Sequence, residues 1–419
     1  MSSVDTLKVR DALDVEQVVR AAIASEQPLE IVGHGSKRLI GQPMATNALL
    51  DLSDLNAVTA YEPNELIITA QAGAPLADVL SLIDSKNQQF AFEPMNTGPL
   101  LGTPDLGTIG GMIGAGLAGP RRIKAGGARD HLLGAHAVSG FGDSFVAGGK
   151  VVKNVTGYDL CKLLAGSWGT LAVMTEVTLK VMPRPESERT LVLRGLDDVT
   201  ANRAMTAALG SPFDVSGAAH LPNSAFRASA VGLAGLGAQG SGFGQAVTLV
   251  RLEGIAASVV HRAATLVKLL TPFGTADTIE DAASAAIWVA LRDVQPFAAN
   301  GALGAWPVWR IVCPPACGGA LGERLARDTG GDVMYDWGGG LIWAALPPKP
   351  DAQAALVRER VNAAGGHATL LRASDEVRRN VDVFHPQPSG LAALGDRVRH
   401  SFDPKRILNR GRLLRGTVT

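Results

Sequence analysis

Residues Asp105–Pro120 read DLGTIGGMIGAGLAGP, a stretch with six glycines and a single charge. Glycine loses more conformational freedom on folding than any other residue, so this density needs a structural reason. The usual reason is that the backbone must come close to something large. We therefore expect this stretch to line a bulky ligand.

A second glycine turn lies upstream, in Leu29–Gly41 (LEIVGHGSKRLIG), directly after a short apolar run. The successive backbone N–H groups of Gly33, His34 and Gly35 can form a concave nest for a pyrophosphate, to which Ser36 adds a hydroxyl and Lys37 a charge. The alternative is an ordinary turn at the exit of a strand. Two such loops about seventy residues apart indicate one extended ligand held at two points, and a dinucleotide such as FAD has that shape.

Two other glycine patterns carry less information. Gly114–Gly119 matches G-x-G-x-x-G, but Pro120 follows at once, and the strand and acidic residue that should flank a Rossmann fingerprint are missing. Gly149-Lys150 is followed by Val151, so it is no phosphate-binding loop of the Walker type.

Composition sets the class of protein. The chain has 419 residues, enough for two or three domains, with 46% hydrophobic and 19% charged residues. Its formal charge is zero, which argues against a nucleic-acid partner. It shows neither an apolar run long enough to span a bilayer nor an apolar signal core near the start, so we expect a cytoplasmic protein. Its three cysteines (Cys161, Cys313 and Cys317) are too few for a disulfide framework or for the four thiolates of an ordinary iron–sulfur cluster.

Periodicity predicts the elements of the first half. Asp14–Ser25 has the apolar spacing of a helix, with Asp14 as a candidate N-cap, and Leu29–Val32 reads as a strand. A strand is expected at Glu65–Ala70, followed by a helix that opens at Ala74-Pro75. Further along, we expect a hairpin over His131–Gly149, one or two strands over Gly169–Met182, and a domain boundary at Pro183–Glu186.

The second half has a different order of elements. Strands and helices alternate as β-α-β-β-α-β between Trp306 and Leu371, which is the order of a ferredoxin-like unit. Helices are expected before it at Ala201–Leu209 and Ala256–Leu270, with a Gly/Ala-rich loop at Ala230–Gly244 between them.

Three segments of the first half resemble the FAD-binding domain of the vanillyl-alcohol oxidase/PCMH superfamily. They are the loop Gly33–Gly41, the block Asp105–Arg122 with ARDHLLG (Ala128–Gly134), and VVKNVTGYDLCKLLAGSWGTLAVMTEVTLKVMPRP (Val151–Pro185). The last segment is typical of the glycolate oxidase and D-lactate dehydrogenase branch. The run Gly119–Arg122 and the chain length resemble the FAD-binding E subunits of glycolate oxidases. SFDPKRILNRGRL (Ser401–Leu413) is similar to the closing FDP-ILNPGR signature of the family, with Arg410 in place of the usual proline.

The resemblance implies an α+β fold, with a PCMH-type FAD-binding domain of two α/β lobes and a ferredoxin-like cap. The implied domains are residues 1–185 for FAD, 190–385 for the cap, and 386–419 for a segment that returns to the FAD domain. The cofactor-binding residues it implies are Gly33, His34, Gly35, Ser36, Lys37, Pro94, Gly107, Thr108, Gly110, Gly111 and Val173. Val173 would offer its backbone. His34 could be a covalent flavin anchor, but we favour a loop histidine and expect non-covalent FAD.

The chain departs from its full-length relatives in the cap. Those relatives carry an H-x-G-D-G-N segment whose histidines bind metal and act on the hydroxy acid, whereas this chain has Asp336–Leu341 (DWGGGL) in the comparable place. Its eight histidines are scattered, so no metal site is expected and the catalytic residues stay unknown. Arg121 and Lys124, with Arg122 between them, are candidate anchors for a substrate carboxylate, or else a basic surface towards a partner or the FAD phosphates. Tyr158 and Trp168 are expected to pack, and Cys313–Cys317 matches no common redox motif.

The implied function is that of an FAD subunit in a complex that oxidises glycolate or another small 2-hydroxy acid to the oxo acid. Its implied partners are a sister FAD subunit and an iron–sulfur subunit that takes the electrons, through which it would attach peripherally to the inner membrane face. Because the cap histidines are missing, the sister subunit would perform the oxidation. The alternatives are a stand-alone flavin oxidoreductase, a structural paralogue without flavin, and a reductase of the UDP-N-acetylenolpyruvoylglucosamine type.

Overall fold

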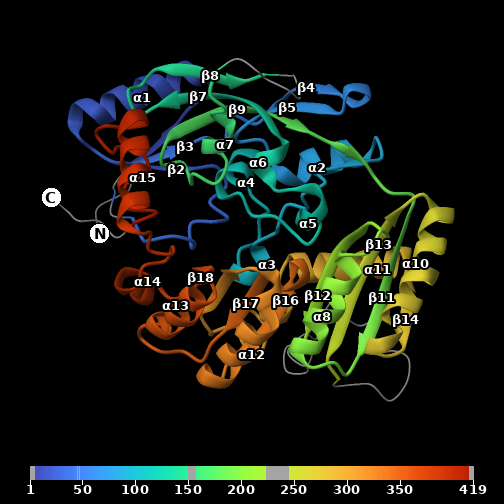
Figure 1. Cartoon of the computed structure of the whole chain (residues 1–419). Helices are drawn as coiled ribbons and strands as arrows, with labels where there is room; N and C mark the ends of the chain where they lie inside the picture. The colour runs from blue at the N-terminus through green and yellow to red at the C-terminus, as the bar shows by residue number, and fades with distance from the viewer. Residues whose placement is uncertain (1–4, 45, 47, 150–156, 223–244, 415–419) are drawn as a thin grey trace.

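The computed structural model describes residues 5–44, 46, 48–149, 157–222 and 245–414. The start of the third resemblance segment, to residue 156, and the expected loop at 230–244 lie outside the described residues. Figure 1 shows the N-terminal half, blue to teal, above a broad sheet coloured green to orange. Among the described residues, no helix combines the length and the apolar character needed to cross a membrane.

The chain begins with a small parallel sheet. Its strands lie in the order β1 (Asp5–Lys8), β3 (Ala48–Asp51) and β2 (Leu29–Val32), and α1 (Ala12–Ser25) connects β1 to β2. The predicted helix and strand are confirmed, but Asp14 as the N-cap is wrong. Asp11 is the cap, because its extended backbone lets its carboxylate accept the Asp14 backbone N–H at 2.8 Å.

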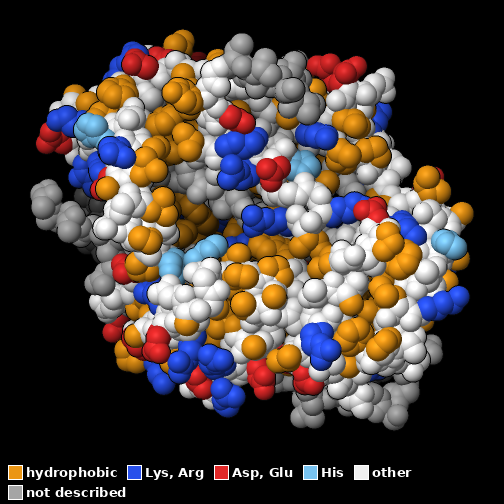
Figure 2. Space-filling model, viewed as in Figure 1, with side chains coloured by type: hydrophobic (Ala, Val, Ile, Leu, Met, Phe, Trp, Pro, Cys, Tyr) orange, Lys and Arg blue, Asp and Glu red, His pale blue; other side chains and the backbone are white. Residues whose placement is uncertain are grey.

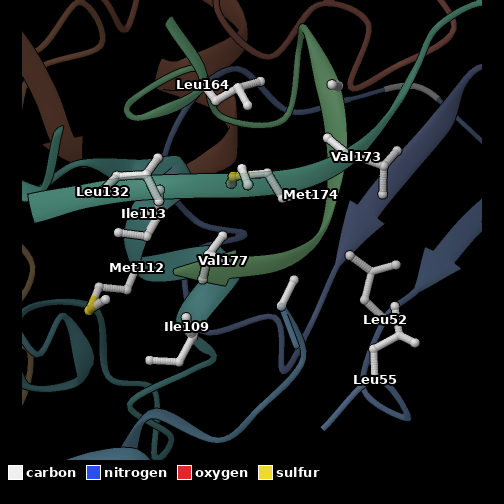
Figure 3. Packing of buried hydrophobic residues seen from close by; sticks show 14 of the residues in the cluster. Leu52, Leu55, Ile109, Met112, Ile113, Leu132, Leu164, Val173, Met174 and Val177 are labelled. Carbon is white, nitrogen blue, oxygen red and sulfur yellow. The ribbon is translucent and has the colours of Figure 1, made fainter. Parts of the chain in front are cut away.

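A five-stranded antiparallel sheet forms the other lobe of this half, and the predicted hairpin is confirmed as β7–β8. Strand order is β4 (Val58–Glu62), β5 (Ile67–Gln71), β9 (Ala172–Lys180), β7 (Leu132–Ser139) and β8 (Ser144–Gly148). The short helix α4 (Ile109–Ala115) packs its apolar side chains against this sheet. Figure 3 shows Ile109, Met112 and Ile113 of α4 beside Leu132 and Val177.

Short elements complete the N-terminal half. The expected helix after Pro75 is α2 (Leu76–Asp84), and β6 (Gln88–Gln89) pairs with β10 (Met182–Pro183). The remaining helices of this half have only four residues each: α3 (Gly98–Leu101), α5 (Arg122–Ala125), α6 (Ala128–His131) and α7 (Cys161–Leu164).

The second half, here called the cap (residues 187–372), is built on one eight-stranded antiparallel sheet. Its order is β14 (Ala276–Glu280), β11 (Ser187–Arg194), β13 (Val247–Gly254), β12 (Val215–Leu221), β16 (Asp332–Asp336), β17 (Leu341–Ala345), β15 (Val308–Val312) and β18 (His367–Arg372). The last four strands, with α12 (Gly318–Thr329) and α13 (Ala354–Ala363), are the predicted ferredoxin-like unit, which is confirmed.

The first four strands form a second unit of the same topology that the sequence analysis did not predict. Its helices are α8 (Asp198–Leu209) and α10 (Ala256–Leu270), and α11 (Asp281–Arg292) follows its last strand. The two units join edge to edge between β12 and β16, where His220 pairs with Tyr335. A long insertion separates β12 from β13, so the strand order of this unit was hidden in the sequence.

The two faces of the cap sheet have different neighbours. Val308, Trp343 and Leu371 share a buried cluster with Leu100 and Leu117 of the N-terminal half. Side chains on the opposite face pack under α8, α10, α12 and α13. One face of the cap is therefore an interface within the chain.

The C-terminal segment contacts the N-terminal half. After α14 (Asp375–Asn380) and α15 (Ser389–Phe402), the Leu29 backbone N–H donates to the Ile407 carbonyl at 2.8 Å and the Asn409 N–H donates to the Leu29 carbonyl at 3.0 Å. The buried Asp403 carboxylate accepts the N–H groups of Ile407 and Leu408 at 3.0 and 2.7 Å, which shapes the turn. Figure 1 shows red α15 beside the N-terminal half.

Candidate flavin site

The two glycine loops meet in space. β2 ends at Val32, and an added Cβ at Gly33 would lie 2.6 Å from the Thr108 side chain, so the loops pass closer than any larger residue would allow. A second link joins His34 to the other loop, since its Nδ1 lies 2.8 Å from an oxygen of Asp105. Gly107, at φ +89°, lies against the side chains of Ser36 and Lys37.

A buried cation lies beneath the first loop. Lys37 is only 8% exposed, and its ammonium has the Ser36 hydroxyl at 3.3 Å and the Leu106 carbonyl at 3.4 Å as its hydrogen-bond partners. None of the described carboxylates forms an ion pair with it. Burial lowers the pKa of Lys37 to about 8, against a weaker opposing effect of Asp105. A buried ammonium without a counter-ion is suited to bind an anion.

The second loop is shaped by its own residues. Thr108 caps α4, with its hydroxyl accepting the Gly111 N–H at 3.2 Å. Gly110 packs so closely on Ala72 that an added Cβ would lie 2.7 Å from the Ala72 Cβ. The glycines of this loop therefore have two effects. They let α4 pack closely on the residues that follow β5, and they leave the backbone accessible on the side of the loop Gly33–Lys37.

One cavity, whose empty volume of about 740 Å³ includes open solvent, lies between the loops. The predicted residues that line it are Gly33, His34, Gly35, Ser36, Lys37, Thr108, Gly110 and Gly111. Three predicted residues do not line the cavity: Pro94, Gly107 and Val173. Pro94 forms a β-bridge with Ala118, and Gly107 lies behind Ser36. The side chain of Val173 is buried in the core (Figure 3). Ala172 and Met174, the neighbours of Val173 on β9, do line the cavity.

Trp168, Asn409 and Arg412 also line this cavity and were not predicted to do so. Asn409 accepts the Ile31 N–H at 2.8 Å and donates to the Trp168 carbonyl at 2.7 Å. Arg412 donates to the Lys37 carbonyl at 2.6 Å. The sequence signal that could have predicted Asn409 and Arg412 in the cavity is the closing motif Ser401–Leu413. The sequence analysis identified this motif but assigned it no position in the site. Tyr158 was expected to pack, and this is wrong, since it is 93% exposed.

These residues fit FAD. Glycines give the backbone access to a bulky ligand, and Lys37 and Arg412 supply positive charge beside them. Arg412 is buried, with its Nε unpaired, and burial lowers its pKa to about 10 despite Glu30 nearby. Both buried cations would be stabilised by the negative charge of a pyrophosphate.

The predicted carboxylate anchors already have partners within the chain. Arg121 donates two hydrogen bonds to Glu253 at 2.7 and 3.0 Å and lies 3.3 Å from Glu93, while Lys124 forms an ion pair with Asp214. Glu93 in turn pairs with the buried Arg251 of the cap at 2.8 Å. Arg121 therefore belongs to a charged network that joins the two halves.

The described part of the chain holds no group of three metal-ligating side chains. Asp336 closes β16 and accepts the Trp337 N–H at 2.7 Å. Burial raises the pKa of Asp336 to about 7. All three cysteines are free thiols.

Comparison with known proteins agrees with this geometry. Residues 6–148 match the model of the FAD binding domain family. The chain is 32% identical to glycolate oxidase subunit GlcE of Escherichia coli K12 over 400 residues, which is 94% of this chain and 95% of that protein. It is 34% identical to glycolate oxidase subunit GlcD of Bacillus subtilis 168 over 173 residues, or 41% of this chain and 35% of that protein.

Among solved structures, p-cresol methylhydroxylase covers 97% of this chain and 88% of its own with a TM-score of 0.67, at 14% identity. At that identity the likeness shows the fold alone. The predicted α+β fold of the PCMH type is confirmed.

Proposed function

This chain belongs to the GlcE family of glycolate oxidase subunits, an FAD-linked family, and we propose that it is the FAD-containing subunit of a complex that oxidises glycolate or a similar 2-hydroxy acid. In this proposal, residues 1–185 form the FAD-binding domain, residues 190–385 form a second domain built on the cap sheet, and residues 386–419 form the closing segment. The observation that carries it is the glycine-lined cavity over the buried ammonium of Lys37, which forms no ion pair with a described carboxylate.

The residues of the chain have distinct roles in this proposal. The backbone of Gly33–Lys37 and the Lys37 ammonium hold the pyrophosphate, while Gly110 and Gly111 keep side chains away from the ligand. Asn409 fixes the first loop through the Ile31 N–H. Gly107, which lies against Ser36, and Val173, which lies between Ala172 and Met174 on β9, support the cavity wall from behind. Bound FAD supplies a two-electron acceptor for the hydride equivalent leaving the α-carbon of the acid.

An iron–sulfur partner is the proposed destination of the electrons. An ordinary cluster requires four thiolates, whereas this chain has three cysteines in all, of which Cys161 and Cys313 are buried. The other proposed partner is a sister flavin subunit of the GlcD kind. Attachment to the inner face of the membrane would then be indirect, through these subunits.

Two divisions of labour between the flavin subunits are open. This chain could oxidise the acid itself, or it could relay electrons for the sister subunit. Asp336–Leu341 in place of the histidine segment favours the relay.

The test is an anaerobic titration of the purified full-length chain with glycolate, followed by its absorption spectrum. A flavin band that stays oxidised with the chain alone but bleaches in the assembled complex supports the relay. Bleaching with the chain alone shows that it holds its own active site. A chain that shows no flavin band, even after addition of FAD, contradicts the proposal.

A further inference from the structure

Two arginines converge on one tryptophan where the cap meets the N-terminal half. The guanidinium carbon of Arg122, from α5, lies 4.6 Å from the ring centroid of Trp337, and that of Arg310, from β15, lies 5.1 Å from the same ring. Trp337 is 6% exposed and donates its indole N–H to the Gly119 carbonyl at 3.0 Å. Both positive charges are therefore held against one indole ring at the end of the glycine block.

Neither guanidinium forms an ion pair or a hydrogen bond with any residue that the structure describes. Burial lowers the pKa of Arg122, and Asp130, which lies beyond ion-pair distance, opposes this only in part. Burial, and then Arg122, lower the pKa of Arg310 to about 10, with only Asp336 acting in the opposite direction. Asp336 itself is held towards its neutral form, so it compensates Arg310 only in part.

The other half of the cap contains the same arrangement with its anions in place. Arg251 on β13 stacks on Trp288 at 4.6 Å, as Arg310 does on Trp337. Glu93 lies 2.8 Å and Glu253 3.4 Å from the Arg251 guanidinium. Burial disfavours the charge on Arg251, but these carboxylates outweigh it and raise its pKa. The guanidinium of Arg251 is thus paired with two carboxylates, whereas no carboxylate lies within ion-pair distance of Arg122 or Arg310 among the described residues.

The position of the pair restricts what the missing carboxylate can be. Arg310 is half-buried between Thr369 and Trp343 on the cap face that packs on the N-terminal half. Arg122 is exposed and forms the outer side. Figure 2 shows Lys and Arg side chains gathered along the hollow between the two halves. A small acid can enter such a place more easily than a side chain of another protein.

We propose that Arg122 and Arg310 form a binding site for the carboxylate of a small 2-hydroxy or 2-oxo acid. Each guanidinium offers a planar pair of N–H donors that match a carboxylate. The proposal rests on the proposed function for the chemical class of the acid. It is linked to the flavin cavity by the glycine block, which lines that cavity at Thr108–Gly111 and contacts Trp337 at Gly119.

The test is calorimetric titration of the full-length chain with oxalate, an unreactive two-carbon carboxylate, at constant ionic strength and with ethylene glycol as the uncharged comparison. We expect oxalate to bind and ethylene glycol not to bind. R122Q and R310Q should each weaken oxalate binding tenfold or more. R203Q, on the exposed face of α8, is the matched control and should leave binding unchanged. If R310Q fails to fold, exposed R122Q still tests the site.

Oxalate binding that is absent from the wild type, or unaffected by both substitutions, overturns the site. Binding that disappears in the complete complex also overturns it, because a partner side chain would then fill the place. The proposed function is tested separately by flavin reduction. Oxalate binding with a flavin that glycolate reduces neither in the chain nor in the complex would keep the site and reject the function. Flavin reduction by glycolate without any oxalate binding to this chain would keep the function and reject the site.

Discussion

The indole N–H of Trp337 donates a hydrogen bond to the backbone carbonyl of Gly119 at 3.0 Å. This bond joins the cap turn Trp337–Gly339 to the last glycine of Asp105–Pro120. Gly119 accepts no larger residue, because an added Cβ would lie 2.8 Å from both Arg292 and Glu93. The cap is therefore docked on the same glycine block that lines the flavin cavity.

Replacing Trp337 by Phe should destabilise the protein by about 0.5–1.5 kcal/mol, because it keeps a ring in place but removes one of the two donors to the Gly119 carbonyl, which retains the Arg122 N–H at 3.2 Å. Urea denaturation of W337F measures the loss. W306F is the matched control, since the Trp306 indole donates to no described residue. Equal stabilities of the two variants would show that the Trp337 bond contributes little.

Replacing Lys37 by Met should stabilise the flavin-free protein near pH 7 and weaken FAD binding. Burial lowers the pKa of Lys37 from 10.5 to about 8, so the unfolded chain holds this proton more tightly than the folded one. At pH 7 the charged Lys37 thus costs on the order of 3 kcal/mol, and wild-type stability recovers as the pH rises from 8 to 10.5.

Thermal unfolding of K37M against pH, with flavin titration, checks both parts. K86M is the control, since Lys86 is exposed. If K37M instead destabilises the flavin-free protein at pH 7, the Lys37 ammonium is already stabilised by groups of the protein itself.

Replacing Asp336 by Asn should change how stability depends on pH. The pKa of Asp336 rises from 3.8 to about 7 on folding, mainly through burial, so the folded protein keeps a proton that the unfolded chain loses. Wild-type stability should fall by as much as about 4 kcal/mol between pH 4 and pH 7 from this group alone.

Asn can still accept the Trp337 N–H but does not ionise, so D336N should lack this decline. Urea unfolding at pH 5 and pH 8 measures the difference. D328N, at a more exposed carboxylate, serves as control. Parallel pH profiles of D336N and the wild type would contradict the expected shift.

Replacing Gly33 by Ala should push the two loops apart, because the new methyl group would lie 2.6 Å from the Thr108 side chain. We expect a loss of about 1–3 kcal/mol in stability and weaker FAD binding. G111A is the control for stability, since its methyl would meet Thr108 at an ordinary 3.5 Å. The measurements are urea unfolding and retention of flavin on gel filtration, and a fully stable G33A that keeps its flavin would refute close contact of the loops.

Much of the fold was predictable because its signals are local. The apolar spacing of α1, the turn between β7 and β8, and the β-α-β-β-α-β order from β15 to β18 can each be read from a short window. The second ferredoxin-like unit was missed because its identity depends on strand pairing. β11, β12 and β13 become a unit only through their order in the sheet, and a long insertion separates two of them.

The candidate site likewise has a part that could be predicted from the sequence and a part that could not. The glycine loops were predictable because glycine density reports close approach of the backbone. Asn409 and Arg412 were not, since they reach the cavity only when the C-terminal segment pairs with Leu29 at the start of β2.

Arg121 and Arg122 show the remaining difference most clearly. The sequence by itself determined that two arginines follow the glycine block and that this block must come close to a ligand. Only the tertiary structure decided that Arg121 pairs with Glu253 while Arg122 lies over the Trp337 ring, as Arg310 does. Identical neighbours in a chain can point to different surroundings, and the charges that surround a side chain come from residues far away in sequence.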